Sequence, residues 1–175
     1  MVQVKLHIHD QIHEDYFRWL FTHTKAGRRK IITPEIAINP KFDLGKTIIS
    51  QVKTAGRPKQ SFGQNFITIS LPLENLKKDQ CFIYFDEFAT QQINYAIAAQ
   101  FEIDFRDFCV SGREKGIKIF IVVQAFMRMY NIRNSPDLFE RLKKKDYRRR
   151  KILDQLLIQG IKNLEGSLQY TDNQN

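Results

Sequence analysis

The fold is decided by the stretch from Asp86 to Val110, DEFATQQINYAIAAQFEIDFRDFCV. One face of this stretch carries large apolar residues at intervals of four, four, four and three positions: Ile93, Ile97, Phe101, Phe105 and Phe108. That spacing is the period of an amphipathic helix. Gly112 and Gly116 follow it and mark its end. We therefore expect one long helix to lie at the centre of the core.

Two more helices are expected after this stretch. Residues 117–132, IKIFIVVQAFMRMYNI, are rich enough in β-branched residues for a buried strand, but their length and apolar spacing favour a helix. The next helix has a strong start, because Ser135, Pro136 and Asp137 supply an N-cap, a proline at the first position and an acidic first turn. We expect this last helix over residues 136–158. Its apolar contacts are expected to be Leu138, Leu142, Ile152, Leu156 and Leu157.

The amino-terminal part has a different pattern. Residues 2–8 alternate apolar and polar side chains, as a half-buried strand does. Asp10 can then cap a helix that runs to about Thr22, and Asp43 can cap a short helix over residues 44–52. Between them, two prolines favour extended chain around residues 33–40. FITISL (66–71) and CFIYF (81–85) are strand candidates, and we expect them to pair with each other.

These elements predict an α+β fold, with short N-terminal strands and helices followed by a helical C-terminal half that ends in a helix-turn-helix-like basic helix. We expect a single domain over residues 1–160 and a partly disordered tail over 161–175. The chain has 175 residues, 42% of them hydrophobic and 14 of them Phe, enough to fill a core. Its two cysteines, Cys81 and Cys109, are too few for a disulfide framework and are expected to be core thiols.

Positive charge is unevenly distributed along the chain, whose formal net charge is +9. Residues 23–65 hold nine basic and two acidic residues, residues 66–110 hold three and seven, and residues 111–151 hold thirteen and four. The densest run covers positions 143–151, where seven of nine residues are basic. Such segregation indicates a binding surface for a polyanion rather than general solubility.

We therefore expect a nucleic-acid-binding surface formed by the basic helix and two basic loops, 25–30 and 53–65. Phosphate contact is the expected role of their cations, and the plain alternatives are a solvated helix face and ordinary surface loops. The candidate residues are Lys25, Arg28, Arg29, Lys30, Lys53, Arg57, Lys59, Arg141, Lys144, Lys145, Tyr147, Arg148, Arg149, Arg150 and Lys151. All of them are expected to meet on one cationic face once the chain is folded.

Other motifs give weaker signals. Gly45-Lys46-Thr47 resembles the end of a phosphate-binding loop, but the pattern needs glycine where Pro40 stands. His7, His9 and His13 with Asp10 are the one metal-like group, at a chain end without a matching Cys or carboxylate cluster. Asp86 with Glu87, or Glu102, Asp104 and Asp107, could form a two-metal nuclease site, but helical spacing favours a solvated face. We expect no catalytic residue, no bound metal and no cofactor.

The C-terminal third also carries a resemblance. Phe126-x-x-x-Tyr130-x-Ile132, then Leu138, Leu142 and Tyr147-Arg148-x-Arg150-Lys151, is similar to small uncharacterised basic proteins of Bacteroidetes-type bacteriophages and mobile elements. No activity is established for that group, so no residue role follows from it. The resemblance implies a phage or mobile-element protein, among which replication accessory factors, regulators and virion components are all small and often basic.

The sequence thus predicts a non-enzymatic accessory or regulatory protein that binds nucleic acid. DNA is favoured over RNA, because Phe66, Phe82, Tyr84 and Phe85 lie in apolar, locally acidic sequence and are interpreted as core rather than base-stacking residues. A virion structural or assembly protein that docks on acidic subunits or packaged DNA is the first alternative, and a metal-dependent nuclease the second. The N-terminus lacks signal-peptide features and no run is apolar enough for a membrane span, so we expect the host cytoplasm or the virion, with no membrane partner. Protein partners and self-association stay open.

Overall fold

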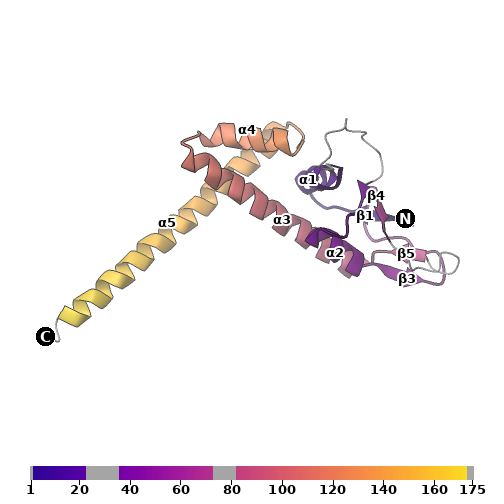
Figure 1. Ribbon diagram of the computed structural model, residues 1–175, viewed down its shortest axis with the longest axis horizontal. Helices are drawn as coiled ribbons and strands as arrows, with labels where there is room; N and C mark the ends of the chain where they lie inside the picture. The colour runs from indigo at the N-terminus through magenta and orange to yellow at the C-terminus, as the bar shows by residue number, and fades with distance from the viewer. Residues whose placement is uncertain (1, 23–35, 73–81, 173–175) are drawn as a thin grey trace.

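The computed structural model describes residues 2–22, 36–72 and 82–172, with side chains up to residue 161 in the last range. Within these ranges the fold is α+β, with short strands in the N-terminal half and helices in the C-terminal half (Figure 1). The strands are β1 (Val2–His7), β2 (Ile36–Ala37), β3 (Lys53–Ala55), β4 (Phe66–Leu71) and β5 (Phe82–Tyr84). The helices are α1 (Gln11–Thr22), α2 (Asp43–Ser50), α3 (Glu87–Glu114), α4 (Ile119–Met129) and α5 (Pro136–Asp172).

The strands form two small sheets. β4 lies between β1, to which it is antiparallel, and β2, to which it is parallel. β3 and β5 form a separate antiparallel pair. The expected pairing of 66–71 with 81–85 is therefore wrong. The inward residues of β4, Ile67, Ile69 and Leu71, are all buried because the face that they share packs on the hydrophobic core.

The helices α1, α3 and α4 follow the sequence predictions closely. Asp10 Oδ1 accepts a hydrogen bond from the backbone N–H of Ile12 at 2.9 Å and so caps α1, which ends at Thr22. Asp86 caps α3 by accepting from the N–H of Ala89 at 2.8 Å. Ile93, Ile97, Phe101 and Phe105 are buried, as expected. Residues 119–129 are helical rather than extended, which confirms the reading of that segment as a helix.

Several boundaries differ from the predictions. Asp43 is the first residue of α2 instead of its cap, and its carboxylate pairs with Lys46 within that helix. Residues 53–55 of the expected basic loop form β3. The helix expected over 136–158 continues to Asp172, through residues expected to belong to a partly disordered tail. A lone exposed glycine such as Gly160 costs a helix only about 1 kcal/mol, so it does not end α5.

One core joins the two halves of the molecule. Aromatic rings of α1, α3 and α4 meet in it: Tyr16 and Phe101 lie edge to face at 5.4 Å, and Phe105 and Phe126 do so at 5.0 Å. Cys109 is buried beside them, as expected, whereas Cys81 lies outside the described residues. The distal part of α5 leaves this core and extends away from every other element (Figure 1). In the described part of the chain, no helix is both long and apolar enough to span a membrane.

Candidate anion-binding groove

An open groove of about 570 Å³ lies where α5 passes α1 and α3. Five cationic side chains of α5 line it: Arg141, Lys144, Lys145, Arg148 and Arg149. The opposite wall comes from the start of α1 and from α3, and the far end is apolar. These other lining residues are Asp10, Ile12, His13, Phe101, Leu142, Ile152 and Leu153. We call this the α5 groove.

Helical spacing explains why these cations share one side of α5. Leu142 and Asp146, four positions apart, are both buried and define the face that packs on the body. Arg141, Lys145 and Arg148 follow one another at the same intervals of four and three on the neighbouring face. Because the buried face packs on the body, the neighbouring row of positively charged side chains lies next to α1 and α3.

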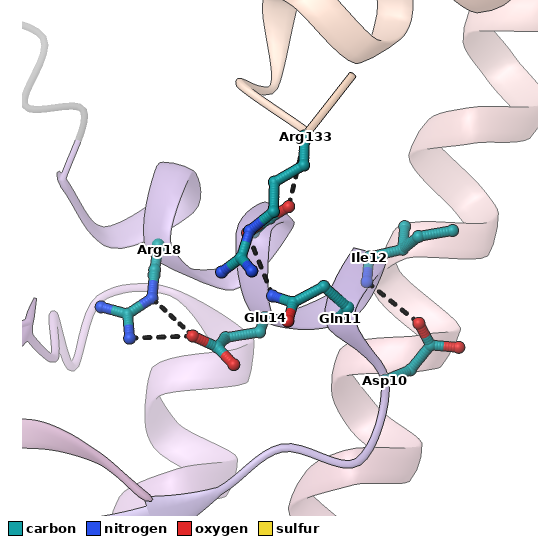
Figure 2. Close-up of polar contacts among 7 residues, drawn as sticks. Asp10, Gln11, Ile12, Glu14, Arg18 and Arg133 are labelled. Atoms are coloured by element: carbon teal, nitrogen blue, oxygen red, sulfur yellow. Dashed lines mark hydrogen bonds and ion pairs between the residues drawn. The ribbon is translucent and has the colours of Figure 1, made fainter. Parts of the chain in front are cut away.

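The start of α1 is held in place by contacts to the chain that precedes α5. Arg133 donates from its backbone N–H and from Nε to the buried carboxylate of Asp15, at 3.0 and 3.1 Å (Figure 2). Asp10, five positions earlier in the chain, caps the helix by accepting a hydrogen bond from the Ile12 N–H with one oxygen (Figure 2). Its other oxygen pairs with Arg141 of α5. Burial raises the pKa of Asp10, but the hydrogen bond from Arg141 and the Ile12 N–H outweigh it, so the pKa lies below its ordinary value. Asp10 therefore stays ionised in the groove.

Lys145 is the most enclosed cation of the groove. It pairs with Glu102 of α3, and its Nζ lies 5.5 Å from the centroid of the Phe101 ring. Burial lowers the pKa of its ammonium group, which shows that its positive charge is less well solvated than on the open surface. Because the ammonium group of Lys145 is poorly solvated, it would also stabilise a phosphate bound beside it.

Arg149 of α5 lies near two other cations, Arg106 and Arg113 of α3, where the two helices cross. Burial lowers the pKa of its guanidinium, and the charges of Arg106 and Arg113 on α3 lower it further. Lys144 and Arg148 are exposed, and neither has an ion-pair partner among the described residues. The α5 groove thus combines free surface cations with cations that repel one another.

His13 lies on the α1 wall, with its ring edge to face with Phe101 at 5.2 Å. Burial lowers the pKa of His13, and Lys145 and Arg141 lower it as well, while Asp10 acts in the opposite direction. The imidazole is therefore neutral at pH 7 and gains a proton only in more acidic solution. A bound polyanion would favour the protonated form.

The cationic candidates that the structure describes do not share one face, contrary to the prediction. Lys53, Arg57 and Lys59 are exposed at the β3 end of the molecule, and α5 lies at the other end (Figure 1). Lys59 is oriented onto Tyr84, with Nζ 4.6 Å from the ring centroid. The pairing of β3 with β5 sets where Lys53 lies, and nothing local in the basic sequence reveals that pairing. The basic loop with Lys25, Arg28, Arg29 and Lys30 lies outside the described residues.

The remaining candidates of α5 lie beside the groove rather than in it. Tyr147 is 61% exposed and Lys151 is exposed, and neither lines the groove. Arg150 lies with Nε 3.1 Å from Oδ2 of the buried Asp146. The guanidinium of Arg150 is therefore paired with a carboxylate of the protein and is less available for a phosphate.

The structure also places the metal-site candidates. The rings of His7 and His9 are 4.8 Å apart, whereas His13 packs on Phe101 in the groove. Asp104 accepts a hydrogen bond from the Tyr16 hydroxyl at 2.6 Å, and Asp107 pairs with Arg106 on the surface. In the ranges that the structure describes, no group of three or more His, Cys, Asp or Glu is arranged to hold a metal ion.

One argument from the sequence fails. Of the four aromatic residues interpreted as core, only Phe85 is buried. Phe82 is 47% exposed, Tyr84 lies under Lys59, and Lys5 lies 5.9 Å from the centroid of the partly exposed Phe66. Exposed aromatics beside lysines are typical of surfaces that stack single-stranded bases. The stated reason to favour DNA over RNA therefore no longer applies.

Sequence reasoning named the groove's five cations but missed its other walls. Asp10 was named as a cap and His13 as a metal candidate, and Phe101 was expected in the core. No local signal indicates that α1 lies against α5, since Asp10 and Arg141 are 131 positions apart. The chain matches no protein-family model, and comparisons with curated proteins and with solved structures give no match.

Proposed function

We propose that this protein binds nucleic acid and that the α5 groove is the surface that contacts its phosphates. The observation that carries the proposal is the gathering of five cationic side chains of one helix along a single open groove. Mutual repulsion among these cations is relieved when phosphates replace the surrounding counterions, and the release of those counterions drives binding.

The groove cations differ in whether a phosphate must displace a carboxylate that is already paired with them. No carboxylate of the described residues pairs with Lys144 or Arg148, so both are available for phosphate directly. Arg141 and Lys145 hold Asp10 and Glu102, so a phosphate must compete with a partner already in place. We therefore expect Lys144 and Arg148 to contribute most of the affinity, with Arg149 next.

Apolar and aromatic groups at the groove support a nucleic acid over a small inorganic anion. Phe101 and His13 form part of its wall, and Ile152 and Leu153 close its far end. His13, Ile152 and Leu153 keep exposed surface that can pack against sugars or bases once the phosphates are held, whereas Phe101 is buried behind them. The proposal covers DNA and RNA alike, and duplex DNA is the first probe because a basic helix matches the dimensions of its major groove.

Fluorescence anisotropy with labelled 20-mers of duplex DNA, single-stranded DNA and RNA tests the proposal at several salt concentrations. The variant Lys144→Ala/Arg148→Ala is expected to bind about 10- to 100-fold more weakly and to lower the salt slope by about 2, since each lost phosphate contact removes about one unit. Lys53→Ala/Arg57→Ala is the matched control, with the same charge removed at the other end of the molecule.

The control variant is expected to bind within about twofold of the wild-type protein. Circular dichroism should show both variants folded, since all four side chains are exposed. The proposal fails if the wild-type protein binds none of the three probes at 50 mM salt. It also fails if the two variants lose affinity equally, because the effect would then reflect net charge alone.

A further inference from the structure

The distal part of α5 exposes a dense row of large apolar side chains. Six such residues lie within ten positions, each between 48% and 65% exposed: Ile152, Leu153, Leu156, Leu157, Ile158 and Ile161. At 3.6 residues per turn, Leu153, Leu156, Leu157 and Ile161 fall on one side of the helix and form the row, whereas Ile152 and Ile158 lie to either side of it. Isolated apolar residues on a surface need no explanation, but a contiguous patch marks an interaction site. Beyond Leu153, which lines the α5 groove, the patch lies on the part of α5 that extends away from the other labelled elements (Figure 1).

This row continues the face by which α5 packs on the body. Leu142, Asp146, Arg149, Leu153 and Leu156 follow one another at intervals of four, three, four and three, so they share one side of the helix. Leu142 is 1% exposed where that side meets the body, and Leu156 is 60% exposed beyond it. The side of α5 that carries Leu142, Leu153 and Leu156 thus passes from a covered to an uncovered environment along the helix.

The exposed area of the row matches a weak interface between two helices. Each of its four side chains exposes on the order of 100 Å², so two copies of the row bury roughly 800 Å² of apolar surface, the size of a weak, transient contact. Identical rows also match each other in spacing, as the two-fold symmetric contacts of homodimers require. A second copy of this chain therefore supplies a partner of the right length and shape.

Charge favours an antiparallel arrangement of the two helices. Residues 152–175 hold one basic and three acidic residues, whereas residues 111–151 hold thirteen basic and four acidic ones. A parallel pair would bring two basic segments and two bodies together at the same end. An antiparallel pair separates them and places each basic segment beside the acidic end of the partner helix. The acidic balance of this end also disfavours an anionic membrane as the occupant.

We propose that the distal part of α5 pairs antiparallel with the same segment of a second copy, forming a homodimer with one α5 groove at each end. The dimer carries two anion-binding grooves on one particle, so both can engage a long polyanion at once. This inference does not depend on the nucleic-acid proposal, because Leu156, Leu157 and Ile161 lie outside the groove, which shares only Leu153 with the row.

Sedimentation equilibrium of the full chain at 10–100 μM tests the pairing. The wild-type protein is expected at twice the chain mass of 20.7 kDa. Leu156→Glu/Leu157→Glu is expected at the monomer mass, since four charges would enter the interface of a dimer. Gln155→Glu/Gln159→Glu adds the same charge at neighbouring positions off the row and should stay dimeric. Because all four residues are exposed, each variant is expected to keep the fold, which circular dichroism checks.

A wild-type monomer at 100 μM would overturn the proposal, as would a dimer that survives Leu156→Glu/Leu157→Glu. Sedimentation with phosphatidylglycerol vesicles, lost in that same variant, would assign the row to a membrane surface instead and also overturn it.

Orientation is tested with pyrene on Asp172→Cys in a Cys81→Ser background. The two labels of an antiparallel pair lie about 30 Å apart, given 1.5 Å per residue from position 152 to 172, and form no excimer. Excimer emission would show a parallel pair and contradict the arrangement.

Discussion

Arg113 of α3 donates from Nη1 to Oδ1 of Asp146 on α5 at 2.6 Å, and this bond fixes the crossing of the two helices. The Asp146 side chain is 2% exposed and has Arg150 on its other oxygen at 3.1 Å, whereas the Arg113 side chain is 32% exposed. A buried carboxylate without its cation is costly, so this contact determines where the basic face of α5 can lie. The α5 groove exists because of that fixed crossing.

Replacing Asp146 should therefore destabilise the whole protein. We expect Asp146→Ala to lower the free energy of unfolding by about 2–4 kcal/mol, because Arg113 and Arg150 lose their shared anion at a buried site. Urea denaturation measures it. Asp107→Ala is the control, since Asp107 and Arg106 form an exposed pair expected to contribute less than about 1 kcal/mol. Equal losses in the two variants would contradict the structural role of Asp146.

Gly45 is expected to tolerate no side chain. A Cβ at this position would lie 2.0 Å from the backbone oxygen of Asn39, which cannot move without shifting the chain before α2. Gly45→Ala should cost about 1–3 kcal/mol or more in the free energy of unfolding, as overpacking does. Gly160→Ala is the matched control: nothing lies within 4 Å of its added Cβ, so the exposed helix should gain up to about 1 kcal/mol. A neutral Gly45→Ala would show that α2 and residue 39 lie further apart.

The thiol of Cys109 should be inert in the folded protein. Burial raises its pKa to about 12, and the neighbouring Asp146 acts in the same direction. In a Cys81→Ser background at pH 8, we expect dithionitrobenzoate to react with Cys109 only when urea unfolds the chain. Release of one thionitrobenzoate per chain within seconds, without denaturant, would contradict the burial of this residue.

Stability should depend on pH through His13. Its pKa is lowered by burial, so the unfolded chain binds more protons than the folded one below about pH 6.5, the ordinary value for histidine. The free energy of unfolding is therefore expected to fall as the pH decreases from 6.5 through the lowered pKa, by at most about 1.4 kcal/mol per pH unit. His7 contributes in the same direction, because its pKa is also lowered.

The contribution of His13 is isolated by comparing the wild-type protein with His13→Gln between pH 7.5 and 5. The variant should lose less stability on acidification. Parallel curves for the two proteins would show that His13 is not buried against Phe101. In the presence of duplex DNA, the histidine resonances should show a raised pKa for His13 if phosphates occupy the groove.

Elements that depend on near neighbours were predictable from sequence. α3 was predicted from apolar spacing, and α4 from apolar spacing and length, because the hydrogen bonds of a helix join residues only four positions apart. The capping of α1 by Asp10 was predictable for a similar reason, since it involves residues two positions apart. The strands were recognised as strands, but their partners were not, since Val2 pairs with Leu71 across most of the N-terminal half. Pairing of neighbouring strands was expected by default and proved wrong.

One part of the candidate site was likewise predictable from sequence, and another part was not. The sequence by itself determined the row of cations on α5, because a basic run on a well-started helix has a fixed angular spacing. Only the tertiary structure decided that Asp10, His13 and Phe101 face that row, and that Lys53, Arg57 and Lys59 do not. The physical reason is that helix geometry is set by bonds between residues four positions apart. Which faces meet depends instead on burying apolar area across the whole chain, and no local pattern encodes that.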